Sequence, residues 1–88
     1  MIFDWNPYKN TVLKAERGIN FDDIANLIDG GTRYIIIENP SSNHQDQKVI
    51  QIFLKEYAYC IPCVKIPWWY FLKTIYPSRK ITKNFKKS

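Results

Sequence analysis

The sequence predicts a single α+β domain in which two helices precede a set of hairpin-connected strands. Between residues 7 and 29, apolar side chains recur at helical spacing, with start and stop signals around them. From residue 32 onward the chain is rich in β-branched and aromatic residues, interrupted by short polar breaks. Helices that precede strands, rather than alternate with them, are typical of an α+β fold with an antiparallel sheet. The 88 residues fit one domain over 1–88.

The N-terminal part is expected to form one short strand and two helices. Residues 2–5 alternate in polarity, as a strand does. Pro7 fits the first position of a helix, and Gly18 fits its C-terminal stop. Asn20 is a good N-cap for the second helix, which ends at Gly30. This part therefore reads β-α-α.

Extended segments are expected over most of the remaining chain, at 32–38, 48–54, 57–64 and 68–76. Pro62 lies inside the third of these segments, and a proline there predicts an edge strand or a bulge. A short basic C-terminal segment follows Pro77. The expected order is therefore β-α-α-β-β-β-β, with two helices packed on a small antiparallel sheet.

Positive charge is concentrated at the C-terminal end. The net charge is +5, yet residues 1–40 carry four basic and six acidic groups. Residues 73–88 carry six basic groups and no acid: Lys73, Arg79, Lys80, Lys83, Lys86 and Lys87. Such an asymmetry indicates that a polyanion or an acidic partner meets this end, or else that the end is a solvated basic tail.

A cytoplasmic protein with no membrane contact is expected. Asp4 follows the start at once, which is unlike a signal peptide, and the longest apolar run is only residues 34–37. Cys60 and Cys63 should then be free thiols. Their C-x-x-C spacing lies within a strand pattern, where positions three apart point to opposite faces, so buried small side chains are favoured over a redox or metal pair. No metal or cofactor is expected, because one further histidine cannot complete a zinc site.

Two other features could serve RNA chemistry or merely structure. His44, the only histidine, lies in a polar loop, where it is either solvated or an acid–base group with a near-neutral pKa. The aromatic run 67–71 would place Trp68 and Tyr70 on one face of a strand, and the residues between and after them on the other. One face should pack on the helices, while the other could stack on bases or be covered.

The segment 73–80 carries the residue types that metal-free RNA cleavage needs. Attack by the 2′-hydroxyl requires a base, a cation for the phosphorane and an acid for the leaving oxygen. Arg79 has a planar fork suited to phosphate, while Lys73 and Tyr76 can move protons only if their pKa values are shifted. Ser78 and Lys80 flank the arginine, and the segment is expected at the end of the last strand.

Blocks at both ends of the chain resemble the BrnT family of toxins. Residues 3–10 (FDWNPYKN) and 16–24 (ERGINFDDI) resemble the opening of that family, and 71–85 (FLKTIYPSRKITKNF) resembles its terminal strand and end. The resemblance implies a RelE-like fold and a type II toxin that arrests growth by cleaving RNA. It also implies a small DNA-binding antitoxin of ribbon-helix-helix type, which covers the toxin and makes the contacts with operator DNA.

By position, the resemblance also assigns residues. Arg79 resembles the arginine on the family's last strand, and Lys48 resembles the basic residue that starts its middle strand. With these, the candidate catalytic set is completed by His44, Lys73 and Tyr76. The candidate RNA-binding residues are Lys9, Ser78, Lys80, Lys83 and Lys86; Trp5 matches the N-terminal motif and could equally be core.

Two positions depart from the family pattern. Many relatives carry a His-Pro after the first strand of the sheet, where this chain has Asn39-Pro40, so the role of that histidine is absent or moved to His44. Where close relatives have an acidic stretch, residues 65–69 read KIPWW, which adds positive charge and aromatic surface. Three hypotheses therefore stand: an endoribonuclease toxin, a non-catalytic basic nucleic-acid-binding module, and a partner-docking protein.

Overall fold

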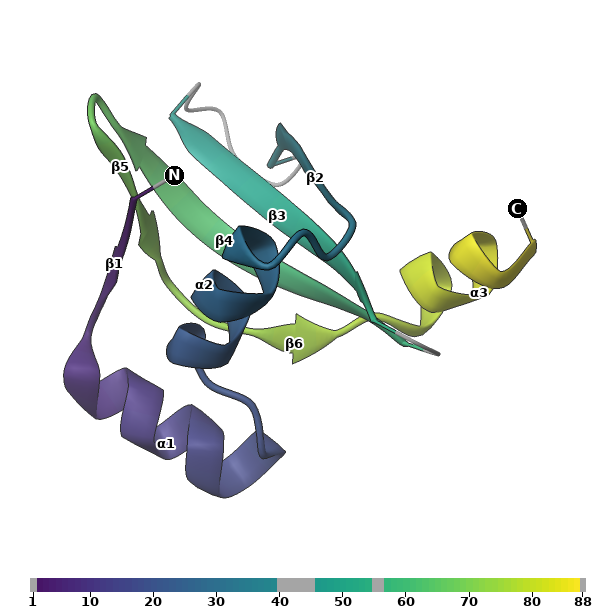
Figure 1. The fold of residues 1–88 in the computed structure, drawn as a ribbon, viewed down its shortest axis with the longest axis horizontal. Helices are drawn as coiled ribbons and strands as arrows, with labels where there is room; N and C mark the ends of the chain where they lie inside the picture. The colour runs from purple at the N-terminus through teal and green to yellow at the C-terminus, as the bar shows by residue number, and fades with distance from the viewer. Residues whose placement is uncertain (1, 40–45, 55–56, 88) are drawn as a thin grey trace.

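The chain forms an α+β domain with a six-stranded mixed sheet (Figure 1). The computed structural model describes residues 2–39, 46–54 and 57–87, of which 84–87 are described as backbone only. In chain order the elements are β1 (Phe3–Trp5), α1 (Pro7–Arg17), α2 (Phe21–Asp29), β2 (Tyr34–Glu38), β3 (Gln47–Leu54), β4 (Tyr57–Ile66), β5 (Trp69–Leu72), β6 (Tyr76–Pro77) and α3 (Arg79–Lys87). None of the helices described is long and apolar enough to cross a membrane.

The predicted N-terminal elements are confirmed, and their caps explain their limits. Pro7 begins α1, behind Asn6, whose side chain accepts hydrogen bonds from two backbone N–H groups of the first turn. Gly18 ends α1 at φ 72°, a left-handed conformation that glycine adopts without steric cost. Asn20 and Asp23 cap α2 reciprocally, each side chain accepting a hydrogen bond from the other's backbone N–H.

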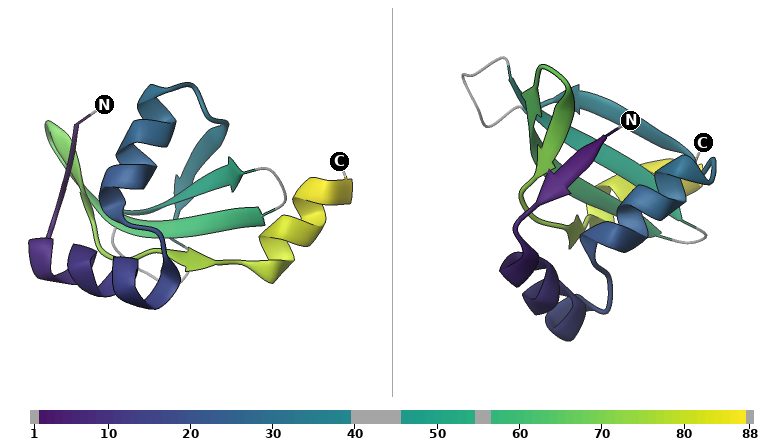
Figure 2. Two further views of the ribbon diagram at one scale, coloured as in Figure 1. Left: turned by 60° about the horizontal axis from the view of Figure 1, so that its bottom comes forward. Right: turned by 60° about the vertical axis from the view of Figure 1, so that its left-hand side comes forward.

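The expectation of a purely antiparallel sheet is wrong at one edge. The strand order is β1-β5-β4-β3-β2, with β6 paired to β4 beyond the end of β5. The β2–β3, β3–β4 and β4–β5 pairs are antiparallel, whereas β1 runs parallel to β5, with Phe3 opposite Tyr70. Both helices separate β1 from β2, so β1 forms no hairpin and instead completes the far edge of the sheet (Figures 1 and 2).

Pro62 does not mark an edge strand. It lies in β4, which is central and pairs with β3 on one side and with β5 and β6 on the other. The Lys73 N–H donates to the Pro62 carbonyl at 2.9 Å, so the backbone polar groups of Pro62 face the β5–β6 side. The bond that Pro62 cannot donate is therefore missing on that side, and the structural irregularity falls in the neighbouring strand.

The C-terminal end differs from the expected single strand over 68–76 and short basic segment. Residues 67–68 form the turn between β4 and β5, and the strand is then broken between β5 and β6. After β6 the chain enters α3, a nine-residue helix. Arg79 is thus the first residue of a helix rather than part of the last strand.

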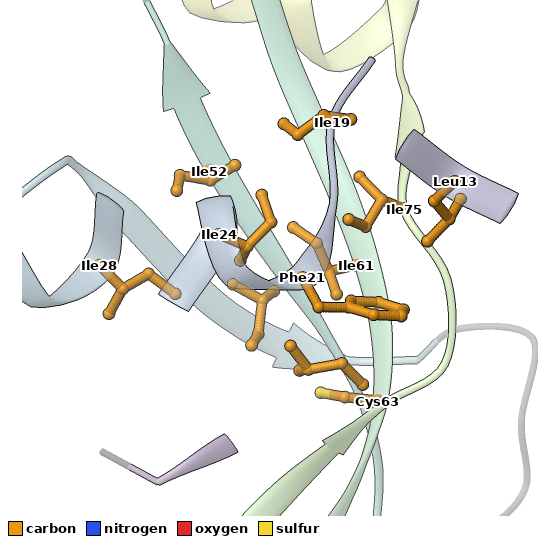
Figure 3. Close-up of a cluster of buried hydrophobic side chains, with 11 residues drawn as sticks. Leu13, Ile19, Phe21, Ile24, Ile28, Ile52, Ile61, Cys63 and Ile75 are labelled. Atoms are coloured by element: carbon orange, nitrogen blue, oxygen red, sulfur yellow. The ribbon is translucent and has the colours of Figure 1, made fainter. Parts of the chain in front are cut away.

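The hydrophobic core lies between α1, α2 and one face of the sheet. Phe21 and Ile24 of α2 are fully buried against Ile52 of β3 and Ile61 of β4, and Leu13 of α1 closes the cluster beside Ile75 (Figure 3). Trp5 packs on the Phe21 ring, with ring centroids 5.8 Å apart. Trp5 therefore serves as core.

Helix α3 is joined to β4 through its first turn. The buried Thr82 hydroxyl accepts a hydrogen bond from the Ala58 N–H at 2.8 Å and donates one to the Ser78 carbonyl at 2.6 Å. The Ser78 N–H donates to the Ala58 carbonyl at 3.0 Å. We refer to these three residues as the α3 clip. Beyond it α3 extends away from the sheet (Figure 2).

Thr82→Val should destabilise the domain by about 1–3 kcal/mol, because it leaves the buried Ala58 N–H without an acceptor. Thr82→Ser keeps the hydroxyl and should cost less. Urea unfolding of the three proteins measures the difference. Equal stability of Thr82→Val and wild type would show that the clip contributes nothing.

Candidate functional site

A one-residue bulge separates β5 from β6. In β4, Pro62 and Cys60 are two residues apart, but their partners Lys73 and Tyr76 are three residues apart. The extra residue falls opposite Pro62, where β4 has no N–H to donate. A bulge of this kind shifts the register and bends the strand that contains it.

The bulge changes which face of the sheet Tyr76 joins. Leu72 and Ile75 both lie in the core, although regular alternation would give one face to residues 72, 74 and 76. Because of the extra residue, Tyr76 lies on the opposite face, beside Cys60. We call this the second face of the sheet; its side chains include Ile35, Ile37, Val49, Phe53, Cys60, Val64, Phe71 and Tyr76.

Three side chains form a small polar cluster on the second face. The Tyr76 and Ser78 hydroxyls lie near the Cys60 thiol, and both act to lower its pKa. The Ser78 hydroxyl also accepts a hydrogen bond from the Ile81 N–H at 3.2 Å, and thereby caps α3. The start of α3 is therefore tied to the end of β6, and Arg79 directly follows the cluster in the chain.

Both titratable groups of this cluster are held in their neutral forms. Burial raises the pKa of the Cys60 thiol, and the nearby hydroxyls of Tyr76 and Ser78 oppose this only in part. Desolvation raises the pKa of Tyr76, and the neighbouring Cys60 raises it further. At neutral pH, Tyr76 is consequently a proton donor and not a base.

Exposed cations flank this cluster in the chain. Arg79, Lys80 and Lys83 project from α3, and Lys73 is exposed at the bulge. Over the described residues the single salt bridge joins Lys48 to Glu38, so none of these four is neutralised by an ion pair. The sequence from 57 to 88 contains no acid at all. The result is a positively charged end of the molecule next to a neutral proton donor.

Other predicted site residues are not brought together with Tyr76. Lys48 alternates with core residues of β3, so it lies on the helix-covered face and pairs with Glu38. Lys9 lies on α1, on the same side of the sheet as the core. His44 lies outside the described residues, as does the side chain of Lys86.

The prediction for Trp68 is wrong, whereas the prediction of buried free cysteines is confirmed. Trp68 is 80% exposed because it lies in the β4–β5 turn, so it does not share a strand face with Tyr70 as expected. Cys60 and Cys63 are both buried free thiols, on opposite faces of β4. Cys63 belongs to the core (Figure 3). The described part of the chain contains no enclosed pocket and no cluster of three metal-ligating side chains.

Cys60 was not singled out as a site residue by the sequence. Its proximity to Tyr76 depends on a strand register that the bulge sets, and the bulge has no local sequence signature except Pro62 on the neighbouring strand.

Comparison of the chain with known family models, curated proteins and solved structures finds no match.

The buried thiols should make the domain less stable in alkali. Burial raises the pKa of Cys63 from 9.0 to about 11, and the pKa shifts of Cys60 and Tyr76 have the same direction. The folded state thus keeps protons that the unfolded chain loses, so the free energy of unfolding falls as pH rises from 9 through about 11. Chemical denaturation across this range measures the slope. Cys63→Ala should show a shallower slope; an unchanged slope would assign the effect to other groups.

Proposed function

We propose that the protein is a metal-independent endoribonuclease toxin of the BrnT type, with a RelE-like arrangement of two helices on one face of a sheet. The resemblance of residues 3–10, 16–24 and 71–85 supports the family. One observation carries the chemistry: neutral Tyr76 lies three residues before Arg79, the first residue of α3. Among the described residues, Arg79 forms no ion pair. We expect the protein to act on RNA in the cytoplasm, without a cofactor.

In this proposal the 2′-hydroxyl of the RNA attacks the adjacent phosphorus, and the bond to the 5′ oxygen breaks. The products are a 2′,3′-cyclic phosphate and a 5′-hydroxyl. Arg79 stabilises the charge of the phosphorane through its guanidinium, while Tyr76 gives its proton to the leaving oxygen. The base is His44 or Lys73, since Lys48 lies on the other face. Ser78, Lys80 and Lys83 contact the RNA backbone.

A small DNA-binding antitoxin, of ribbon-helix-helix type, would neutralise this toxin. The acid-free stretch from 57 to 88 is complementary in charge to an acidic segment of such a partner. The contacts with operator DNA would be made by the antitoxin. The departure at 65–69 leaves Lys65 over the Tyr70 ring, 4.9 Å from its centroid, and Trp68 exposed for contact with the partner.

Inducible expression in a bacterium tests the toxin proposal. Wild-type protein should arrest growth and degrade RNA, whereas Arg79→Ala should do neither. Arg17→Ala at the end of α1 is the matched control, because it removes the same charge from an exposed site on a helix that packs on the other face of the sheet from Tyr76, and it should stay toxic. Harmless expression of a folded wild-type protein, with intact RNA, would refute the proposal.

Tyr76→Phe separates cleavage from binding. It removes the proton donor but keeps the ring, so the purified variant should bind RNA as wild type does and cut it at least about 100-fold more slowly. Gel-based cleavage and fluorescence anisotropy measure the two properties. RNA binding by the wild type without any cleavage would favour the second candidate function, a basic nucleic-acid-binding module, for which the unpaired cations on α3 are sufficient.

A further inference from the structure

The two edges of the sheet differ in how well they are protected. At one edge, β1 is three residues long and exposes Asp4. At the other edge, β2 has the sequence YIIIE and pairs, within the described part of the chain, only with β3. It contains no proline, lysine or positive φ angle. Edge strands of stable monomers usually carry such features, because they prevent strands of other molecules from adding.

The hydrogen-bond pattern shows which groups of β2 face outward. The Phe53 N–H donates to the Arg33 carbonyl, and the Asn39 N–H donates to the Gln47 carbonyl. By alternation, odd-numbered residues between them direct their polar groups to β3. The N–H and C=O groups of Tyr34, Ile36 and Glu38 therefore point away from the sheet.

We propose that β2 pairs with β2 of a second copy of this chain, in an antiparallel register centred on Ile36. The pairing would join two six-stranded sheets into one continuous sheet with two-fold symmetry. In this register all three outward-facing residues form hydrogen-bonded pairs: Ile36 with itself, and Tyr34 with Glu38 of the second copy. About six backbone hydrogen bonds would form. The inference does not depend on the ribonuclease proposal.

Side chains in this register are complementary to themselves. Glu38 lies opposite Tyr34 of the second copy, so like charges do not face each other, and its ion pair with Lys48 can remain. Ile35, which is 44% exposed, lies opposite Ile37, which is 36% exposed, so each covers the other on the second face. Residues 1–40 carry no excess of positive charge to oppose the contact.

The size of the contact sets the expected strength. A five-residue strand is about 17 Å long, so the pairing alone buries less surface than a stable dimer of standard size needs. The dimer should therefore be in concentration-dependent equilibrium with the monomer.

Sedimentation velocity over a concentration series from about 1 µM to about 500 µM tests the proposal. Wild type should move from monomer to dimer as concentration rises. Ile37→Lys should remain monomeric, because it places an ammonium group against Ile35 of the second copy. Ile2→Lys is the matched control: Ile2 is 65% exposed beside the opposite edge, so this variant should dimerise as wild type does. A wild type that is monomeric throughout, or a dimer unaffected by Ile37→Lys, would overturn the proposal.

Disulfide mapping tests the register with milder changes. Residues 35 and 37 would form a pair without backbone hydrogen bonds, whose short Cα separation suits a disulfide. A mixture of Ile35→Cys and Ile37→Cys chains should therefore cross-link faster under mild oxidation than either chain alone. The native thiols are buried and should not interfere. Faster cross-linking of either chain with itself would contradict the register centred on Ile36.

Discussion

Pro62 occupies a position in the middle of the sheet where a backbone N–H would normally be used. On the β3 side, the residues next to Pro62 make the hydrogen bonds between the strands, so no N–H is needed from it. On the β5–β6 side, the hydrogen bond that its N–H would donate cannot form. The last strand responds with one extra residue opposite the proline. From that residue onward the alternation of side chains is reversed, so Tyr76 leaves the core face and meets Cys60. The position of the polar cluster and the starting point of α3 both follow from this constraint.

Local signals in the sequence were sufficient for the first half of the fold. Pro7 and Gly18 bound α1, and Asn20 and Gly30 bound α2. Together with the helical period inside each pair, these signals define both helices, because they act within a few residues. The partner of β1 is determined by tertiary packing, which periodicity cannot report. Pro62 correctly signalled an irregularity but not the strand that would carry it. Ser78 is a residue type that favours an N-cap and could have indicated the start of α3, but we expected only a short basic segment after a strand that ends at Tyr76.

For the candidate site, the sequence identified three of the side chains but not Cys60, which lies on another strand. Tyr76, Ser78 and Arg79 are adjacent in the chain, so their proximity was predictable. Cys60 joins them only through the register of β4 and β6, and it adds to the desolvation that raises the pKa of Tyr76. Lys48 looked equivalent to the other cations in sequence, but strand alternation placed it on the opposite face, in an ion pair. The number of charged residues can be counted from a sequence, whereas the face of the sheet on which each one lies depends on the strand register.

The α3 clip has a consequence for motion. It fastens the helix to the sheet at a single turn, while the core of the domain is built entirely from other elements. The first turn of α3 can therefore open without exposing that core, at a free energy lower than that of global unfolding. The distance between Arg79 and Tyr76 would then be a fluctuating quantity, and an anionic ligand that touches both would shift the population toward the closed arrangement.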